Sequence, residues 1–528
     1  KSVPDFAGRS QQFRPRQLQA QNNVVIVSPQ LTGKTKQLIV FFEEGSPKPS
    51  ELAQKINTLG SRQRVQPAGQ IAASHDNANE LDRHEEAEIA SENRPGKDSL
   101  AAADANDEPL HLTADLIRAK VQMPDGRAEA DSAAELTEVW TEGNVDIQQS
   151  HGDDQEPMHL TGQRLHLQNA GGNGQVLHVS GQPAVIRDRG FDIEGNEVFL
   201  DRQKNRTWID GPGALRLPVK NDFEGHSLES PSLLTIWWNE KMTFDGRTAT
   251  FLDDVKAALN DSGLQCEEME VVLTQRVLFS GDRRQTPQAE VRQVVCKDGV
   301  EIYHAQYVNE EPTEMRRGRF ATLTLDQKTG RMEAVGPGEV ALWRPGRGNR
   351  AALAPRAVAQ ANQPLEAEVS KWEFTRVTFS GQTSGNMRER ERQTTFTDRV
   401  RIVYGPVTHP LDTIDPDNLP KDGGEMQCDA LQILQRQDSA TQRNYIELRA
   451  EGDAKLEGRT FYAQADSISF DESKEMYTLR SKGNRQVTIW RQTTPGGDYD
   501  QASAKSMRFI PSRPWLESDK MTGIRGAN

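Results

Sequence analysis

The stretch "FLDRQKNRTWIDGPGALRLP", residues 199–218, returns in altered form as "TLDQKTGRMEAVGPGEVALWRP", residues 324–345. Leu-Asp and then Gly-Pro-Gly stand in both copies with the same spacing, and no candidate catalytic residue recurs with them. Pro cannot donate to a β-ladder and Gly permits a sharp bend, so Gly-Pro-Gly inside a strand pattern predicts a bulge or a corner. The repeated phrase therefore indicates one corner of a stacked antiparallel fold.

Five elements recur in the same order in three units of the chain. The units begin at "WTEGNVDI" (residue 140), "FLDDVKAA" (residue 251) and "FTDRVRIV" (residue 396). Each continues through an amphipathic stretch, a strand that runs into a glycine, a strand that ends in an aspartate, and a short last strand. Order repeated three times is typical of a repeat array.

The predicted boundaries follow these repeats. We expect a partial N-terminal β unit at 1–45 with two strands, β repeats at 108–220, 221–345 and 370–495, a linker at 346–369, and a partial C-terminal β unit at 496–528. Residues 46–107 are rich in Ala, Glu, Asn, Pro and Ser without periodicity, which predicts a disordered or partly helical insertion.

The elements of the repeats have the alternation of strands. In "RFATLTLD", Ala321, Leu323 and Leu325 fall on one face, while Thr322 and Thr324 fall on the other. The connections are short and rich in turn-forming residues, as antiparallel hairpins require. The chain is therefore predicted to be all-β, with helix confined mainly to 46–107. An array of about 12 to 15 strands per sheet would be a rod of ~60–70 Å.

Composition excludes several classes of function. The 528 residues carry a formal charge of −14, which argues against a nucleic-acid partner because phosphate binding needs a basic face. Three cysteines are too few for a disulfide framework and lack the spacing of a zinc site. No run of 18 apolar residues occurs, so no transmembrane helix is expected. The chain begins at Lys1 without an apolar signal core, which we interpret as a mature or trimmed chain.

At the level of motifs, the chain resembles the OstA/LptA-like family of periplasmic lipopolysaccharide-transport proteins. The resemblance lies in "TEGNVDI…HLTGQRLHLQ…VSGQPAVIRDRGFDIEGNEVFLDRQKNRTWIDGPGALRLP" and extends over roughly residues 110–528 in three imperfect copies. It implies an open two-sheet β-jellyroll, shaped like a folded taco, whose sheets clasp lipid acyl chains. It also implies head-to-tail joining of similar jellyroll proteins through edge strands, a periplasmic or envelope location, and a role in outer-membrane assembly. The chain departs from the family in its length and long insertions.

The inward apolar positions are the candidate lipid-binding groove. An ordinary sandwich core is the alternative interpretation of the same side chains. The positions are Leu165, Leu167, Ile193, Val198, Leu200, Met269, Val271, Leu273, Leu323, Leu325, Ile468 and Phe470.

Other residues invite functional interpretations that have simpler alternatives. Cys266 and Cys428 occupy equivalent repeat positions, which core packing explains, and a Cys266–Cys296 disulfide is a further alternative. The three histidines of one hairpin lack ligand spacing and a nearby carboxylate, so we expect no metal there. They are His159, His166 and His178.

Two charged stretches complete the candidates. The acidic stretch Asp412 to Glu425 lacks the residue order of a calcium loop, which favours a solvated insertion. The basic stretches at 315–320 and 343–350 could contact lipid phosphates, although solvated strand ends explain them as well.

The sequence contains no signature of an enzyme: G-x-x-x-x-G-K-[ST], G-x-S-x-G and H-E-x-x-H are all missing. We therefore expect a non-enzymatic bridge for lipopolysaccharide or another envelope lipid, without a cofactor. The alternatives are a parallel β-helix that degrades polysaccharide, and a β-sandwich surface or polysaccharide-binding protein. Parallel or antiparallel pairing of the strands separates the first alternative from the bridge.

Overall fold

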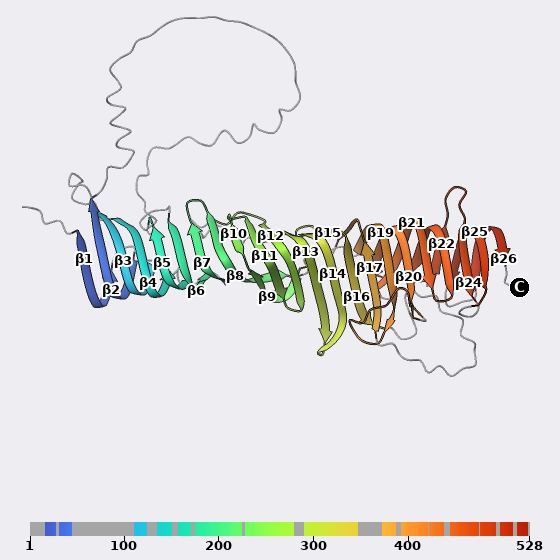
Figure 1. Cartoon of the computed structure of the whole chain (residues 1–528), viewed down its shortest axis with the longest axis horizontal. Helices are drawn as coiled ribbons and strands as arrows, with labels where there is room; N and C mark the ends of the chain where they lie inside the picture. Colours follow the sequence, from blue (N-terminus) through green and yellow to red (C-terminus); the bar gives the residue numbers. More distant parts are fainter. Residues whose placement is uncertain are drawn as a thin grey trace, which may run out of the picture.

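The structure is a computed structural model that describes residues 16–27, 31–44, 110–123, 135–149, 157–169, 175–188, 190–223, 227–278, 290–346, 372–386, 392–420, 422–437, 444–474, 476–492, 497–510 and 515–525. Within these ranges the chain forms 26 β-strands in one sheet and no helix, so none that could cross a membrane. The prediction of an all-β stacked array is thereby confirmed. The strands follow one another along a rod, from β1 at one end to β26 at the other (Figure 1).

The bounds of the strands are β1 Gln17–Val27, β2 Leu31–Glu44, β3 Leu110–Met123, β4 Glu135–Gln149, β5 Met158–Gln168, β6 Val176–Asp188, β7 Phe191–Asp201, β8 Arg206–Asn221, β9 Ser227–Trp238, β10 Lys241–Phe244, β11 Thr248–Leu259, β12 Ser262–Leu273, β13 Val291–Val308, β14 Glu311–Asp326, β15 Arg331–Val335, β16 Gly338–Pro345, β17 Trp372–Phe379, β18 Gln382–Asn386, β19 Arg392–Val407, β20 Gly424–Gln437, β21 Asn444–Gly458, β22 Phe461–Asp471, β23 Met476–Arg480, β24 Val487–Gln492, β25 Tyr499–Ile510 and β26 Trp515–Arg525.

Most strands are long and change direction once, so that each contributes to two halves of the sheet. We call these halves arm A, which contains the short strands β10, β15, β18 and β23, and arm B, which contains β9, β16, β17 and β24. The long strand β8, for example, pairs with β10 through 207–210 and with β9 through 213–221. The two arms are therefore two halves of one sheet that share their long strands.

The change of direction occurs at a corner where the ladder register shifts. At six strands the corner consists of two consecutive residues with positive φ: 22–23, 143–144, 253–254, 298–299, 398–399 and 452–453. Three of these corners fall inside the three stretches that begin the predicted repeat units. In β8 the corner is Gly211-Pro212-Gly213, with Gly211 at φ +88°, as its sequence predicts.

The inner face of each arm carries a row of side chains, nearly all of them apolar, that runs from strand to strand along the rod. In arm A, cross-strand partners connect Ile117, Thr141, Leu165, Val179, Val198, Ile209, Met242, Phe251, Met269, Cys296, Leu323, Ala334, Thr383, Phe396, Leu431, Ala450, Ile468, Leu479 and Met507. We call this the A row, and every one of its residues is buried. A register shift of one residue would turn such a row outward, so the apolar pattern fixes the pairing.

A matching row lies on the inner face of arm B. It connects Leu112, Ile147, Leu160, Ile186, Ile193, Leu215, Ile236, Ala257, Leu264, Ile302, Gly318, Val340, Val377, Ile402, Met426, Leu456, Ala463, Ile489 and Ala502. We call this the B row. Buried residues of both rows belong to one hydrophobic cluster, so the arms pack against each other along the rod.

The array is longer than the sequence suggested. Because four of the 26 strands belong to arm A alone and four to arm B alone, each arm contains 22 strands in the described part of the chain. At about 4.8 Å per strand this is a rod of roughly 100 Å, so the expected ~60–70 Å was too short. β1, β2, β25 and β26, which lie outside the three predicted repeats, account for part of the difference, and short strands within the repeats account for the rest.

Strand pairing is antiparallel throughout the described ranges except between β2 and β3, which are parallel. The exception follows from chain length. β2 ends at Glu44 and β3 begins at Leu110, and the long connection between them lets the chain return to the starting end of β2. The antiparallel ladders exclude the parallel β-helix architecture for the described residues.

Two of the predicted segments lie outside the described residues: the insertion at 46–107 and nearly all of the linker at 346–369. The sheet continues across the predicted unit boundary near 220, because β8 pairs with β9 there. It also continues across the boundary near 345, where β16 pairs with β17. The boundaries between units remain predictions.

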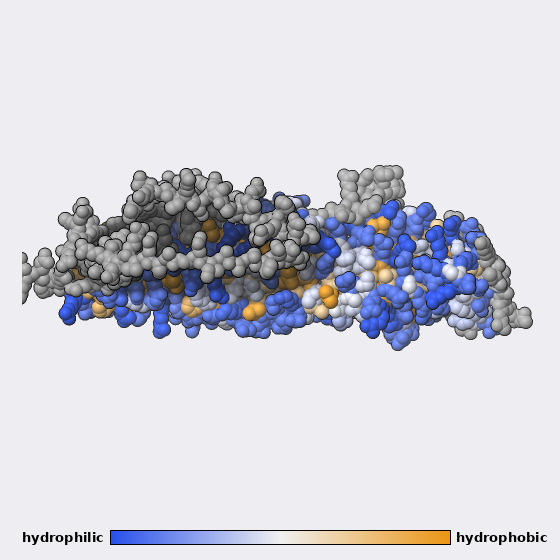
Figure 2. Space-filling view, turned by 90° about the horizontal axis from the view of Figure 1, so that it is seen from above, coloured by the Kyte–Doolittle hydropathy of each residue, from blue (hydrophilic) through white to orange (hydrophobic). Residues whose placement is uncertain are grey.

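The outer surface is mostly hydrophilic, with separate hydrophobic spots along the rod (Figure 2). One larger apolar cluster lies on the outer face of arm B and contains Trp343, Trp372 and Phe374. The segment at 408–420 packs over it through buried Ile414, and the Trp343 Nε1–H donates to the Asp412 carbonyl oxygen at 2.8 Å. The acidic stretch predicted as a solvated insertion is thus partly a cover for this cluster.

Candidate functional site

The interior between the arms widens into a cavity of about 380 Å³ near the middle of the rod. Residues of both arms line it: Leu323 and Phe396 come from the A row, and Ile302, Val340 and Val377 come from the B row. Leu325, Met332 and Phe470 extend the apolar wall on arm A. The volume lies at the small end of the range for ligand pockets in proteins.

Aromatic side chains close the interior on the C-terminal side of the cavity. Phe470 lines the cavity and lies 4.7 Å, between ring centroids, from Tyr477, which stacks on Phe509 at 5.1 Å. Tyr477 on arm A shares a hydrogen bond with Tyr404 on arm B, and burial raises the pKa of both phenols. The hydroxyl pair therefore joins the two arms inside the hydrophobic cluster.

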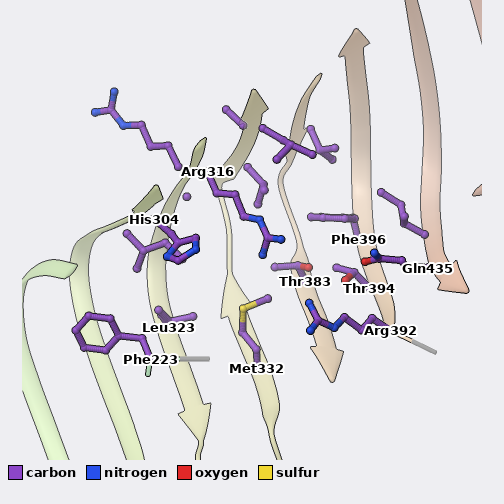
Figure 3. A pocket seen from close by; sticks show the side chains of 18 of the residues that line it. Phe223, His304, Arg316, Leu323, Met332, Thr383, Arg392, Thr394, Phe396 and Gln435 are labelled. Atoms are coloured by element: carbon purple, nitrogen blue, oxygen red, sulfur yellow. The ribbon is translucent and has the colours of Figure 1, made fainter. Parts of the chain in front are cut away.

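On the N-terminal side, Phe223 covers the cavity where the chain leaves β8 (Figure 3). The turn after β14 holds this segment in place, because the Gln327 Nε2 donates to the Phe223 carbonyl oxygen at 3.1 Å. We call the cavity between these two ends the chamber, and part of its surface is open to solvent.

All twelve predicted groove residues lie on the inner face. By strand alternation, Ile193 lies in the B row, and the other eleven lie on arm A, in the A row or next to it toward the strand ends. Eight are buried: Leu165, Leu167, Val198, Met269, Leu323, Leu325, Ile468 and Phe470. The remaining four, Ile193, Leu200, Val271 and Leu273, are partly exposed.

Only some of these twelve residues meet the cavity. Leu323, Leu325 and Phe470 line it, whereas Ile468 is fully buried between Ala450 and Leu479. Some predicted groove positions therefore border the cavity, while others, such as Ile468, belong to a packed core on the same face.

The cavity wall also carries polar groups that the apolar pattern did not reveal. Thr383 is 1 % exposed, and its Oγ1 has no hydrogen-bond partner. The side chains of Arg316 on arm B and Arg392 on arm A extend into the same space (Figure 3). Thr394 and Gln435 lie beside Arg392 on arm A. The wall of the cavity therefore carries polar groups among apolar ones, and Met332 lies in register with Thr394, next to Thr383.

Ion pairs and hydrogen bonds order the rim of arm B. The Arg316 Nε donates to Glu314 Oε1 at 2.5 Å, and the Arg344 Nε donates to Glu373 Oε2 at 3.1 Å. His304, the cross-strand partner of Arg316, is hydrogen-bonded through Nδ1 to the Ser262 hydroxyl at 2.7 Å. These contacts hold the rim side chains in defined positions at the cavity.

The sequence suggested phosphate contacts for two basic stretches, and the structure separates their members. Arg316 and Arg344 line the cavity. Arg317 also touches its edge but pairs with Glu301 at 2.9 Å, and Arg319, which does not line the cavity, pairs with the same carboxylate. Alternation along β14 explains why neighbouring arginines differ in this way. Residues 347–350 lie outside the described ranges.

The three cysteines are buried free thiols. A hydrogen bond with Cys266 and burial raise the pKa of the Cys296 thiol. Burial, with Asp429 nearby, raises the pKa of Cys428 to about 12. Core packing therefore accounts for their positions, and the structure contains no Cys266–Cys296 disulfide.

The expectation that no carboxylate accompanies the three histidines was wrong. His159 Nε2 lies 2.7 Å from Asp146 Oδ2, and His178 contacts Glu197. His166 Nε2 is 3.8 Å from Glu138 Oε2. Cross-strand register places these carboxylates beside rings that are far from them in sequence. The histidines face outward, and no cluster of metal-ligating side chains occurs among the residues described.

Two of these histidines belong to a row of rings on the outer face of arm A. Trp140 stacks on His166, His178 stacks on Phe199, and Phe199 stacks on Trp208, with centroid separations of 5.1, 4.2 and 4.8 Å. Cross-strand aromatic pairs stabilise neighbouring strands. The row thus reinforces the outer side of β4 to β8.

No model of a known protein family matches the chain, and no curated protein matches it either. The resemblance to OstA/LptA-like proteins remains a prediction from motifs.

Proposed function

We propose that the chain is a non-enzymatic lipid-binding protein that shields acyl chains between its two arms. The observation that carries the proposal is the cavity of about 380 Å³ between the arms, whose lining surface is mostly apolar and comes from both arms. Burying apolar surface contributes roughly 25 cal/mol per Å², so an acyl chain in this space would be stabilised relative to water. The proposal assigns no catalytic residue.

The rod suggests how such a protein would work in a cell envelope. A row of apolar positions about 100 Å long is long enough to shield lipid tails across an aqueous gap. Together with the resemblance to OstA/LptA-like proteins, this supports transport of lipopolysaccharide or another envelope lipid across a periplasm, in service of outer-membrane assembly.

Partners of similar fold would extend the bridge. In the described part of the chain, β1 pairs with β2 alone and β26 pairs with β25 alone, so each leaves one edge for another strand. Edge strands of this kind are templates for head-to-tail pairing. Deleting residues 511–528 removes β26 and leaves β25 whole, and it should change concentration-dependent association in sedimentation. A monomer at every concentration, unaffected by the deletion, would contradict the bridge.

Photocrosslinking tests lipid binding directly. A photoreactive amino acid at position 325 would face the cavity, and one at position 324 would face outward from the same strand. With the full chain and radiolabelled phospholipid vesicles or lipopolysaccharide, we expect label at 325 and little at 324. Equal labelling at both positions, or none at 325, would refute lipid binding in the cavity.

A further inference from the structure

Two buried side-chain oxygens in the described cavity wall have no hydrogen-bond partner, Gln327 Oε1 and Thr383 Oγ1, and folding alone does not explain the hydroxyl of Thr383. Thr383 stands in the A row between Ala334 and Phe396, where the neighbouring strands contribute apolar side chains. A valine would have the same shape without a buried hydroxyl that lacks a partner. Buried polar groups are normally hydrogen-bonded, so an orphaned hydroxyl in a cavity wall indicates a group that arrives with a ligand.

Two guanidinium groups lie on the same side of the chamber. Arg316 extends from the rim of arm B and Arg392 from arm A, and in Figure 3 their ends are directed toward the space around Thr383 from two sides. Guanidinium groups match the geometry of carboxylate and phosphate oxygens, and hydrogen bonds to such anions are the strong ones. Donors from both arms therefore surround one position in the chamber.

The lining surface of the chamber is mostly apolar, and the chamber is small. Leu323, Leu325 and Phe223 contribute to the apolar wall, Asp222, Asp326 and Gln327 are polar members of the same wall, and the total volume is about 380 Å³. This space suits one extended acyl chain better than several chains side by side. The arrangement is that of a site for a molecule with one polar end and one apolar tail.

We infer that the chamber binds a single-chain anionic amphiphile, with its carboxylate or phosphate between Arg316 and Arg392 and with an oxygen accepting from the Thr383 hydroxyl. A fatty acid and a lysophospholipid share this chemistry. The inference rests on the proposed lipid-binding function and adds to it the head group, the number of chains and the position along the rod. Phe470 and the Tyr404–Tyr477 pair would end the site on its C-terminal side.

Titration calorimetry on the delipidated full chain tests the inference with three probes that have the same tail. Palmitate and 1-palmitoyl-lysophosphatidic acid carry anionic heads, and 1-monopalmitoylglycerol is neutral. We expect one site per chain and at least about tenfold weaker binding of the neutral probe. The better of the two anionic probes identifies the source of the head group.

Variants with matched controls locate the site. Arg316→Gln and Arg392→Gln should each weaken binding of the anionic probes about tenfold, and Thr383→Val should weaken it several-fold. Arg319→Gln removes an outward arginine of the same strand as Arg316, and it should leave binding unchanged. Thr141 carries the other A-row hydroxyl without a hydrogen-bond partner, but it does not line this cavity. Thr141→Val should therefore leave binding of the probes unchanged.

The possible outcomes distinguish this inference from the broader proposal. If the neutral probe binds as tightly as palmitate, or if Arg316→Gln and Arg392→Gln behave like Arg319→Gln, the anionic head site is wrong while lipid binding stands. If no probe binds, both are wrong. If a glutamine variant unfolds at a lower temperature than the parent chain, Arg316→Lys and Arg392→Lys are used instead, because lysine keeps the positive charge. Tighter binding of the anionic probes than of the neutral probe in these lysine variants supports the site. Equal binding of anionic and neutral probes overturns it.

Discussion

An aspartate placed on the inner face should have different consequences beside the cavity and away from it. Ile468 is fully buried, and its partners in the A row, Ala450 and Leu479, are fully buried too. Leu325 is 9 % exposed and lines the cavity. The pair Ile468→Asp and Leu325→Asp therefore compares the same chemical change in a packed core and at a hollow.

The free-energy cost at position 468 has two parts. Removing a buried isoleucine side chain costs about 2–5 kcal/mol. A fully buried carboxyl has its pKa raised by about 3–5 units, and each unit corresponds to 1.36 kcal/mol. At pH 7 the folded chain must hold a proton that the unfolded chain has lost, which adds about 4 kcal/mol. The total of about 6–9 kcal/mol is large enough to unfold the surrounding strands.

At position 325 only the first part should remain. A carboxylate there can be hydrated by water in the cavity, so the expected cost is about 2–3 kcal/mol, the value for lost leucine burial. Lipid capture at the cavity should nevertheless be lost, because a carboxylate is not tolerated against an acyl chain.

The pH dependence of unfolding distinguishes the two positions. A carboxyl whose pKa is raised in the folded chain lowers the free energy of unfolding most at pH values above that raised pKa. This loss of stability disappears below the pKa of the unfolded chain, about 4. Urea unfolding followed by far-UV circular dichroism should therefore show Ile468→Asp recovering about 4 kcal/mol from pH 7 to pH 4. Leu325→Asp should track the parent chain. An equal pH-dependent loss in both variants would mean that position 325 lies in a closed core, and the cavity argument would fail.

Three further predictions concern the corners, the tyrosine pair and the thiols. Gly299→Ala and Gly452→Ala both place a side chain at positive φ, but only at Gly452 would the new Cβ meet another side chain, that of Asp429. The free energy of unfolding, measured by urea denaturation, should therefore fall by about 1–2 kcal/mol for Gly299→Ala and by more for Gly452→Ala, and equal losses would contradict the contact with Asp429. Burial raises the pKa of Tyr404 and Tyr477, so their contribution to stability is present below pH 10 and is lost as pH rises further. In a spectrophotometric titration of the folded chain, these two phenols should still be un-ionised at pH 11. Their ionisation below that pH would contradict the buried pair. With the pKa of Cys428 raised to about 12, this buried thiol should resist iodoacetamide at pH 8 in the folded chain and react after denaturation, and rapid labelling of the folded chain would show that it is accessible.

Much of the fold was readable in the sequence because alternation and turn chemistry are local. The period of two in Ala321, Leu323 and Leu325 predicted the inner face correctly, and Gly211-Pro212-Gly213 predicted a corner. The length of the rod was underestimated, since strands such as β15 and β18 are only five residues long and carry little periodicity of their own.

The site was less readable, because it depends on contacts between the arms. Thr383 belongs to β18 and Arg392 to β19, and nothing in their local sequence places them in the same cavity wall as Arg316. Once the inner face is known, alternation does place them on it: Thr383 interrupts the A row, and Arg392 lies on the same face as Phe396, four residues earlier in the same strand. Whether an inner-face position borders the cavity or the packed core depends on the volumes of the side chains that the other arm places opposite it. The sequence of a single strand does not contain that information.

The corners determine where a chain of this fold can change. A residue added within a corner would shift one arm by one position and turn its inner row toward water, so the number of residues there is fixed. A residue added where two strands meet at the rim disturbs no register, and the two longest connections, after Glu44 and after Gly346, are attached at such rims. Two such proteins could therefore differ in every rim connection and every outward side chain while keeping the same corners and inner rows. Related proteins of this fold would share the spacing of their corners rather than the identity of their residues.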